Sequence, residues 1–291
     1  MSHQVKEIIK LMEDIAPPHL AESWDNVGLL VGSEQAKVNK VMLTLDVTDD
    51  VIQQAICEKV NLIISHHPVL FTTIKEINDR TLTGSTLLKL IHHGISVYSA
   101  HTNFDKAKGG TDDILAELLG IQDVKPLLPS PMENPTAKLD ELFLNHGSDS
   151  SDSAVGWGSL GRIGRLPEAQ ALEEYLKKIK NILKTETVDF IGDPARKIQI
   201  VASCAGAGGD FVEDARKAGA DLFITGEVKY HEQLPILDGD MALATFGHYA
   251  TEYPAILSLK RRLQNFTNIL QWKVDFISSK DYGNRFRRLR E

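Results

Sequence analysis

The stretch Leu62-Ile63-Ile64-Ser65-His66-His67-Pro68-Val69-Leu70 decides how the rest of the chain is interpreted. Leu62 to Ile64 is short, aliphatic and β-branched at two of three positions, which predicts a buried strand. Pro68 has no N–H to donate, so the strand ends before it and leaves His66 and His67 at its carboxyl end. Ligands bind at that edge of open α/β sheets. Because neighbouring side chains leave a strand on opposite sides, two histidines here suit two different metal ions. The alternative is a polar strand end that holds two histidines by chance.

The composition is that of a soluble globular protein. The 291 residues suffice for two ordinary domains or one large one, with 42% hydrophobic and 25% charged residues. We find no apolar run long enough to span a bilayer and no signal-peptide core near the N-terminus. The two cysteines, Cys57 and Cys204, lie far apart, which fits a reducing compartment. A net charge of −8 gives no electrostatic footprint for nucleic acid. We therefore expect a cytoplasmic protein without membrane contact, and nucleic acid is not an expected partner.

Helical and extended patterns alternate along both halves of the chain, which is typical of an α/β fold. In the first half, helices are predicted at Val5–Glu13, Thr48–Lys59, Gly84–His93 and Thr111–Leu119, with strands at Lys40–Asp46, Leu62–Ile64 and Gly94–Ser99. In the second half, helices are predicted at Pro167–Leu183, Asp210–Ala218 and from about Thr251 through Leu263, with strands at Lys197–Ser203, Asp221–Glu227, Met241–Phe246 and Ile269–Ile277.

A different composition separates these halves. Prolines at 126, 129, 131 and 135 precede a Ser/Asp run at 148–153, so we interpret 126–158 as a connector or insertion point with one element near Leu139–Leu144. The predicted units are then residues 1–125 and 159–291. The glycines at 156–164 resemble fragments of a phosphate-binding loop, but no strand–loop–helix context of the right length supports that function.

The two halves also resemble each other. Val60–His67 matches Ala220–Glu227 in apolar pattern, and each follows a strand, a turn and a helix. The next strand in each half runs into a histidine followed four residues later by an acid, as in His101 and Asp105. This repeat predicts two similar α/β units related by a pseudo-two-fold axis, with the polar strand ends converging on a metal cleft between them.

Such a cleft would collect imidazoles and carboxylates. Its candidate side chains are His66, His67, His101, Asp105, Glu227, His231, His248 and Glu252. Three neutral imidazoles plus two carboxylates suit Zn, Mn, Fe, Co or Ni better than Ca or Mg. With one bridging carboxylate, five residues supply about three bonds to each of two ions and leave positions for water. His248 and Glu252 are four residues apart, so on a helix they would share one face, whereas a helix that starts near Thr251 leaves His248 just before it. The spacing tolerates either arrangement. It is common by chance and gains weight only from the other motifs.

These motifs together resemble the Nif-three-like dinuclear metal-centre family, whose members are also labelled GTP cyclohydrolase type-two homologues. The resemblance rests on Trp24-Asp25-Asn26-x-Gly28, Ser65–Pro68, Ala100–Asp105, Thr225–Glu227 and Gly247–Glu252. It covers nearly the whole chain apart from roughly residues 122–155 and the basic tail. It implies metal ligands at His66, His67, Asp105, His248 and Glu252, with Glu252 as the bridge.

The resemblance has further implications for site and assembly. It makes His101, Glu227 and His231 outer-sphere or substrate-side candidates, each with a structural hydrogen-bonding role as the alternative. It places Trp24 in a loop flanking the cleft, either packed or in contact with substrate. It also implies a toroidal homohexamer, and the connector is too short for the large extra domain that some members carry.

Two functions from different classes fit these expectations. In the first, the protein is a metal-dependent hydrolase of a small molecule, in which activated water attacks a phosphoester, amide or ring carbon while His101 or Glu227 moves the proton. In the second, it binds or delivers metal, or acts as a scaffold, without turnover. The GTP cyclohydrolase label is not matched by a recognisable guanine pocket. The tail from Arg285 to Arg290 is a solvated segment or an oligomer contact, with anion or nucleic-acid binding as the alternative.

Overall fold

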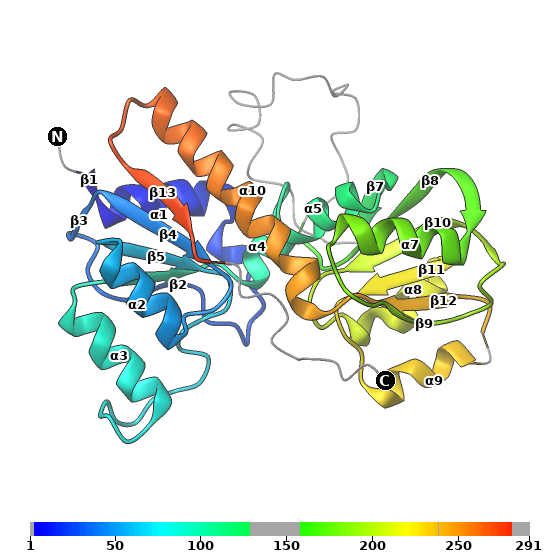
Figure 1. The fold of residues 1–291 in the computed structure, drawn as a ribbon, viewed down its shortest axis with the longest axis horizontal. Helices are drawn as coiled ribbons and strands as arrows, with labels where there is room; N and C mark the ends of the chain where they lie inside the picture. Colours follow the sequence, from blue (N-terminus) through cyan, green and yellow to red (C-terminus); the bar gives the residue numbers. More distant parts are fainter. Residues whose placement is uncertain (1–2, 129–157, 238, 281–291) are drawn as a thin grey trace. The chain divides into compact units, whose positions relative to one another are not determined.

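The computed structural model describes residues 3–128, 158–237 and 239–280 (Figure 1). The chain folds into two compact units. Unit 1 runs through Ala107 and resumes at Ala255, and unit 2 runs from Lys108 to Pro254. The expected element near Leu139–Leu144 and the basic tail lie outside the described residues.

These limits differ from the predicted boundaries at 125 and 159. The strand β7 (Gln122–Pro126) pairs antiparallel with β8 (Arg162–Ala171), so the residues before the connector belong to unit 2. The C-terminal strand β13 (Asp275–Ser278) pairs in parallel with β4 (Lys40–Thr44), which places it in unit 1. Strand pairing between segments that are distant in the sequence therefore determines which unit each segment belongs to.

Unit 1 is built on a five-stranded sheet with the order β13-β4-β5-β6-β2. Strands β13, β4, β5 and β6 are parallel, and β2 pairs antiparallel with β6. The remaining elements are β1 (His3–Gln4), α1 (Val5–Ile15), β2 (Gly28–Val31), β3 (Lys37–Val38), α2 (Asp49–Cys57), β5 (Leu62–Ser65), α3 (Leu82–His92), β6 (Ser96–Ser99) and α4 (Thr102–Lys106).

Unit 2 is built on a six-stranded sheet with the order β7-β8-β10-β11-β12-β9. Its other elements are α5 (Thr111–Leu118), α7 (Leu172–Ile182), β9 (Asp189–Ile191), β10 (Lys197–Cys204), α8 (Val212–Lys217), β11 (Leu222–Thr225), α9 (Tyr230–Leu237), β12 (Ala242–Thr245) and α10 (His248–Ile269). Helix α10 continues past Pro254, so its later turns belong to unit 1. No described helix in either unit is long and apolar enough to cross a membrane.

The two sheets share a core topology. In unit 1 the parallel strands β4, β5 and β6 are followed by the antiparallel edge strand β2, which precedes them in sequence. In unit 2 the parallel strands β10, β11 and β12 are likewise flanked by the antiparallel strand β9, which also comes first in the chain. The α/β class and the predicted similarity of the two units are therefore confirmed.

Apolar side chains on alternate strand positions fix which helices cover each sheet. In unit 1, Met42 and Ile63 pack with Ile52 of α2 and Leu90 of α3. In unit 2, one face packs against α5 and α7 and the other against α8 and α9, because successive residues such as Phe223 and Ile224 point to opposite faces. Both faces of the unit 2 sheet are thus buried, as expected for parallel strands.

Two predicted helix starts are wrong. The helix predicted from Pro167 begins at Leu172, and Pro167 lies in β8 where the pairing with β10 shifts between Ile198 and Ile200. That irregularity accommodates a residue without an N–H. Helix α10 begins at His248 rather than near Thr251, and it contains Pro254. A proline removes only one hydrogen bond from a 22-residue helix, so the helix extends past it.

Candidate metal centre

Unit 1 brings its predicted ligands to the carboxyl ends of β5 and β6. Backbone N–H groups of His66 and His67 donate to the carbonyls of Thr44 and Leu45 at 3.0 and 2.9 Å. These two hydrogen bonds, made just beyond the regular strand pairing, hold both histidines beside the end of β4. Their ring centroids are 5.1 Å apart at an interplanar angle of 51°.

His101 lies with these two histidines. It is the N-cap of the short helix α4, and possible ligand atoms of His66, His67 and His101 all lie within 4.8 Å of one another. The expectation that His66 and His67 diverge to opposite sides is therefore not met, because the chain has left regular β geometry at this edge. This spacing puts three imidazoles within reach of a common ion or of two adjacent ions.

Each of these imidazoles has its Nδ1 engaged. His66 Nδ1 lies 3.0 Å from the Ala100 carbonyl, His67 Nδ1 lies 2.8 Å from Asp46 Oδ1, and His101 Nδ1 lies 3.0 Å from Asp25 Oδ1. Carbonyl and carboxylate oxygens only accept hydrogen bonds, so each Nδ1 donates. In a neutral imidazole the lone pair then resides on Nε2, the nitrogen that binds a metal when the other ring nitrogen is held in this way.

Asp105 adds a carboxylate to the group. It lies in the first turn of α4, and its backbone N–H donates to the His101 carbonyl at 3.0 Å. Its Oδ1 atom is buried and lies 3.5 Å from His66 Nε2. A metal ion is a suitable neighbour for a buried carboxylate oxygen that faces an imidazole nitrogen.

Asp25 holds the His101 side of this group in place. One carboxylate oxygen accepts from His101, and the other accepts from the backbone N–H and the hydroxyl of Thr102 at 3.0 and 2.5 Å. Burial by itself raises the pKa of Asp25, but the hydrogen bonds from His101 and Thr102 outweigh it and hold the pKa well below its usual range. Asp25 is therefore ionised at neutral pH and fixes the orientation of the His101 ring.

Unit 2 contains a second set of ligand atoms at the start of α10. His248 Nδ1 lies 3.0 Å from Glu227 Oε1, and His248 Nε2 lies 3.0 Å from Glu252 Oε1. Because Nδ1 donates to Glu227, a neutral His248 turns its Nε2 lone pair toward the Glu252 carboxylate. A cation at this position, or a proton on the ring, removes the repulsion between them. The donor set thus fits a transition-metal ion.

Gly206 packs against this pair, and the sequence did not identify it. Its φ of +65° lies in the left-handed region, and a Cβ there would collide with Glu252 Oε1 and approach His248 Nε2 to 3.2 Å. Its N–H donates to the Thr251 hydroxyl at 3.0 Å, which ties the β10–α8 loop to α10. A carboxylate and an imidazole can occupy this corner because residue 206 has no side chain.

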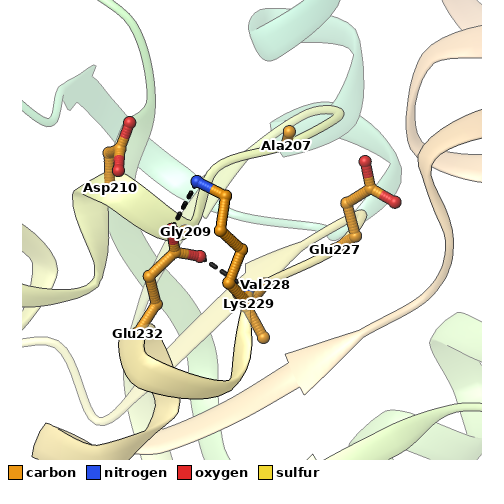
Figure 2. A pocket seen from close by; sticks show the side chains of 7 residues that line it. All are labelled: Ala207, Gly209, Asp210, Glu227, Val228, Lys229 and Glu232. Atoms are coloured by element: carbon orange, nitrogen blue, oxygen red, sulfur yellow. Dashed lines mark hydrogen bonds and ion pairs between the residues drawn. The ribbon is translucent and has the colours of Figure 1, made fainter.

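A hollow of about 200 Å³ adjoins Glu227 in unit 2 (Figure 2). Its lining residues are Ala207, Gly209, Asp210, Glu227, Val228, Lys229 and Glu232. Figure 2 shows Lys229 reaching toward Glu232, and these side chains form an ion pair of 3.0 Å. His231 is exposed at the start of α9 with its ring against Tyr230, and no contact among the described residues connects it to His248.

Asp46 is a second side chain that the sequence reasoning missed. It follows the end of β4 and accepts the hydrogen bond from His67 Nδ1. The sequence shows only that Asp46 ends a predicted strand, Lys40–Asp46; its nearness to His67 follows from the parallel pairing of β4 with β5. Polar residues just beyond two adjacent parallel strands lie at one edge of the sheet.

Comparison with known proteins identifies the family. The model of Duf34/NIF3 (NGG1p interacting factor 3) matches residues 3–284. The chain belongs to the DUF34/NIF3 family. Two relatives, each named GTP cyclohydrolase 1 type 2 homolog, come from Clostridium acetobutylicum and Clostridium perfringens. The first is 36% identical over 91% of both chains, and the second is 34% identical over 97% of this chain and 98% of its own.

Two solved structures share the fold of this chain. A Bacillus cereus protein related to NIF3 superposes with a TM-score of 0.86 at 24% identity, covering 99% of both chains. A hypothetical protein of Staphylococcus aureus superposes with a TM-score of 0.84 at 28% identity, covering 98% of this chain and 99% of its own. The predicted family resemblance is confirmed, and the clustered histidines and carboxylates give this member a possible metal site.

Proposed function

We propose that this DUF34/NIF3 protein is a metal-dependent hydrolase of a small molecule. It would hold two divalent transition-metal ions, of Zn, Mn, Fe, Co or Ni, through His66, His67, Asp105, His248 and Glu252. The observation that carries the proposal is the common arrangement of its histidines. His66, His67, His101 and His248 each direct Nδ1 at a carbonyl or carboxylate acceptor.

Residues of the chain would position the metal-binding histidines and accept a proton during hydrolysis. When bound, the ions would polarise a substrate oxygen and lower the pKa of water. His101 would accept a proton at Nε2, because Asp25 fixes its Nδ1–H. Glu227 would orient His248 through the hydrogen bond to its Nδ1 and border the hollow that could admit part of the substrate.

Metal content per chain tests the binding part of this proposal. Protein purified without added metal or chelator should carry about two transition-metal ions per chain. Glu252→Ala and Asp105→Asn should reduce that content while the chain remains folded. Glu213→Ala, which removes an exposed carboxylate paired with Arg216 in α8, should keep it. Equal metal content in all four proteins would overturn the assignment of Glu252 and Asp105 as ligands.

Turnover separates the hydrolase from the alternative of metal delivery. Hydrolysis of phosphoester or amide substrates should be lost in His67→Ala and Glu252→Ala. His101→Gln should lose activity while it keeps its metal, because it removes a proton acceptor rather than one of the proposed ligands. Metal that transfers to an apo-acceptor protein without hydrolysis of any substrate would favour delivery and contradict the hydrolase.

We also propose that the protein assembles as a homohexamer. Exposed apolar side chains on α3 support self-association, since Leu82 is 79% and Ile91 57% exposed in the single chain. Light scattering coupled to gel filtration should give the mass of six chains. A monomer at micromolar concentration would contradict this proposal and leave the metal assignment untouched.

A further inference from the structure

Two large aromatic side chains stand in solvent beside His101. Trp24 is 58% exposed and Phe71 56% exposed. Their ring centroids are 6.0 Å apart, and the ring planes are inclined by 50°. The centroid of each also lies 6.2 Å from that of His101, with an interplanar angle of 73°. Both rings are therefore steeply inclined to the imidazole, in T-shaped arrangements with it.

The loops that carry these rings are fastened to the same site. Asp25, next to Trp24, accepts hydrogen bonds from His101 and from Thr102. Asn26 Nδ2 donates to the carbonyl of Leu70, next to Phe71, at 2.5 Å. The two loops are thus joined to each other and to the start of α4. Ordered loops lower the entropic cost of binding a ligand against their side chains.

Single exposed apolar residues are common on protein surfaces and need no explanation. Trp24 and Phe71 differ because both converge on His101. That histidine belongs to the group whose ligand atoms lie within 4.8 Å of one another, together with His66 and His67. Because the two ring planes are inclined by 50°, a flat ligand stacked on one ring would meet the other at an angle and lie beside the His101 imidazole.

We propose that Trp24 and Phe71 form a subsite that binds a planar aromatic ring of the substrate beside His101. This rests on the proposed function, because it assigns the substrate class of the same site. Aromatic rings favour offset or tilted stacking on other rings, and a stacked nucleic-acid base gains affinity of this kind from an aromatic side chain. A saturated ring or an open-chain sugar lacks the flat π-face that such stacking requires.

Saturation-transfer NMR on the metal-loaded protein tests the subsite, with adenosine as the aromatic probe and ribose, which has no aromatic ring, as the control. We expect transfer to the adenine protons and none to free ribose. Trp24→Ala and Phe71→Ala should each weaken adenosine binding about tenfold or more. Ile269→Ala, which removes another exposed apolar side chain of unit 1 at the end of α10, should bind adenosine like the parent protein.

Three outcomes would overturn the subsite: no transfer to adenosine at millimolar concentration, equal transfer to ribose, or unchanged binding in both aromatic variants. If the parent protein does not bind adenosine and Trp24→Ala changes the oligomeric mass, Trp24 and Phe71 would instead form a contact between copies of the chain. Metal content is measured on the same samples. A parent protein that retains no metal after loading would refute the proposed function, whereas a metal-retaining parent that binds no aromatic ring would refute the subsite alone.

Discussion

At the scale of single residues, the geometry of the site depends on the carboxylates that accept hydrogen bonds from its histidines as well as on the histidines themselves. Asp46 and Glu227 each accept a hydrogen bond from an imidazole Nδ1, at 2.8 and 3.0 Å. Such partners fix the tautomer and orientation of a metal-binding histidine. Both acceptors are more than half exposed, so their contribution comes from orientation rather than from burial of charge.

Asp46→Ala should therefore weaken metal binding about tenfold or more without unfolding the protein. The His67 ring would lose the acceptor that holds its Nε2 in place. Competition with a chromogenic chelator measures the affinity. Asp49→Ala is the matched control, because it removes a nearby aspartate, at the start of α2, that pairs with Lys89 instead of a histidine. Equal affinities in the two variants would contradict the role of Asp46.

Gly206 allows a test by addition of a single methyl group. Gly206→Ala should lower both metal content and stability, because the new Cβ would displace the Glu252 carboxylate. Gly219→Ala has a similar positive φ of +78° but nothing within 4 Å of the added Cβ. It should show only the backbone cost of about 1 kcal/mol in unfolding free energy, with metal content unchanged. Identical behaviour of the two variants would mean that the contact with Glu252 is unimportant.

At the scale of elements, a buried arginine joins α5 to β8. Arg162 is fully buried, and it forms an ion pair with Asp113 and donates to the carbonyls of Ser159 and Gly161. Removing one member of a buried pair leaves the other charge without compensation. The ion pair thereby fastens helix α5 to the sheet of unit 2, although α5 follows directly after the first segment of unit 1 in the sequence.

Arg162→Met should lower the unfolding free energy by about 3 kcal/mol, because Asp113 Oδ1 and the two carbonyls would lose the hydrogen bonds from Arg162. Urea denaturation followed by circular dichroism provides the measurement. Arg165→Met, three residues further along the same strand, replaces an exposed arginine whose side chain donates only weakly to Gln199 at 3.3 Å. It should change stability by less than about 0.5 kcal/mol. Similar losses in both variants would argue against the buried pair.

The helices and strands that could be predicted are those determined by residues close together in the sequence. The strands β4, β5 and β6 and the helices between them follow from runs such as Leu62–Ile64 and from period-3.6 stripes. Pro167 misled the prediction, because an irregularity in the pairing with β10 accommodates it within a strand. Asp46 was missed for a related reason, since its link to His67 depends on the register of β4 with β5.

At the scale of the whole molecule, the first sheet depends on the last described strand. The edge strand β13 pairs with β4 from Asp275↔Lys40 to Ser278↔Leu43, and Phe276 is only 4% exposed. Truncation before Lys273 should therefore lower the melting temperature of unit 1 and its metal content. Truncation after Lys280 keeps β13 and should retain both. Calorimetry and elemental analysis on the two truncated proteins decide this, and unchanged melting of the shorter one would contradict it.

Unit 1 is formed from two separate segments of the chain, and this affects how the protein folds during synthesis. A ribosome releases the strands of unit 2 as one continuous block, so this unit can fold while synthesis proceeds. Unit 1 receives its fifth strand only when residues 275–278 emerge, more than two hundred residues after β4. Closing a pairing of such long range is slow. The nascent chain thus carries the His66–His67 edge on an unfinished sheet until residues 275–278 have emerged, and tight metal capture there should follow their pairing with β4.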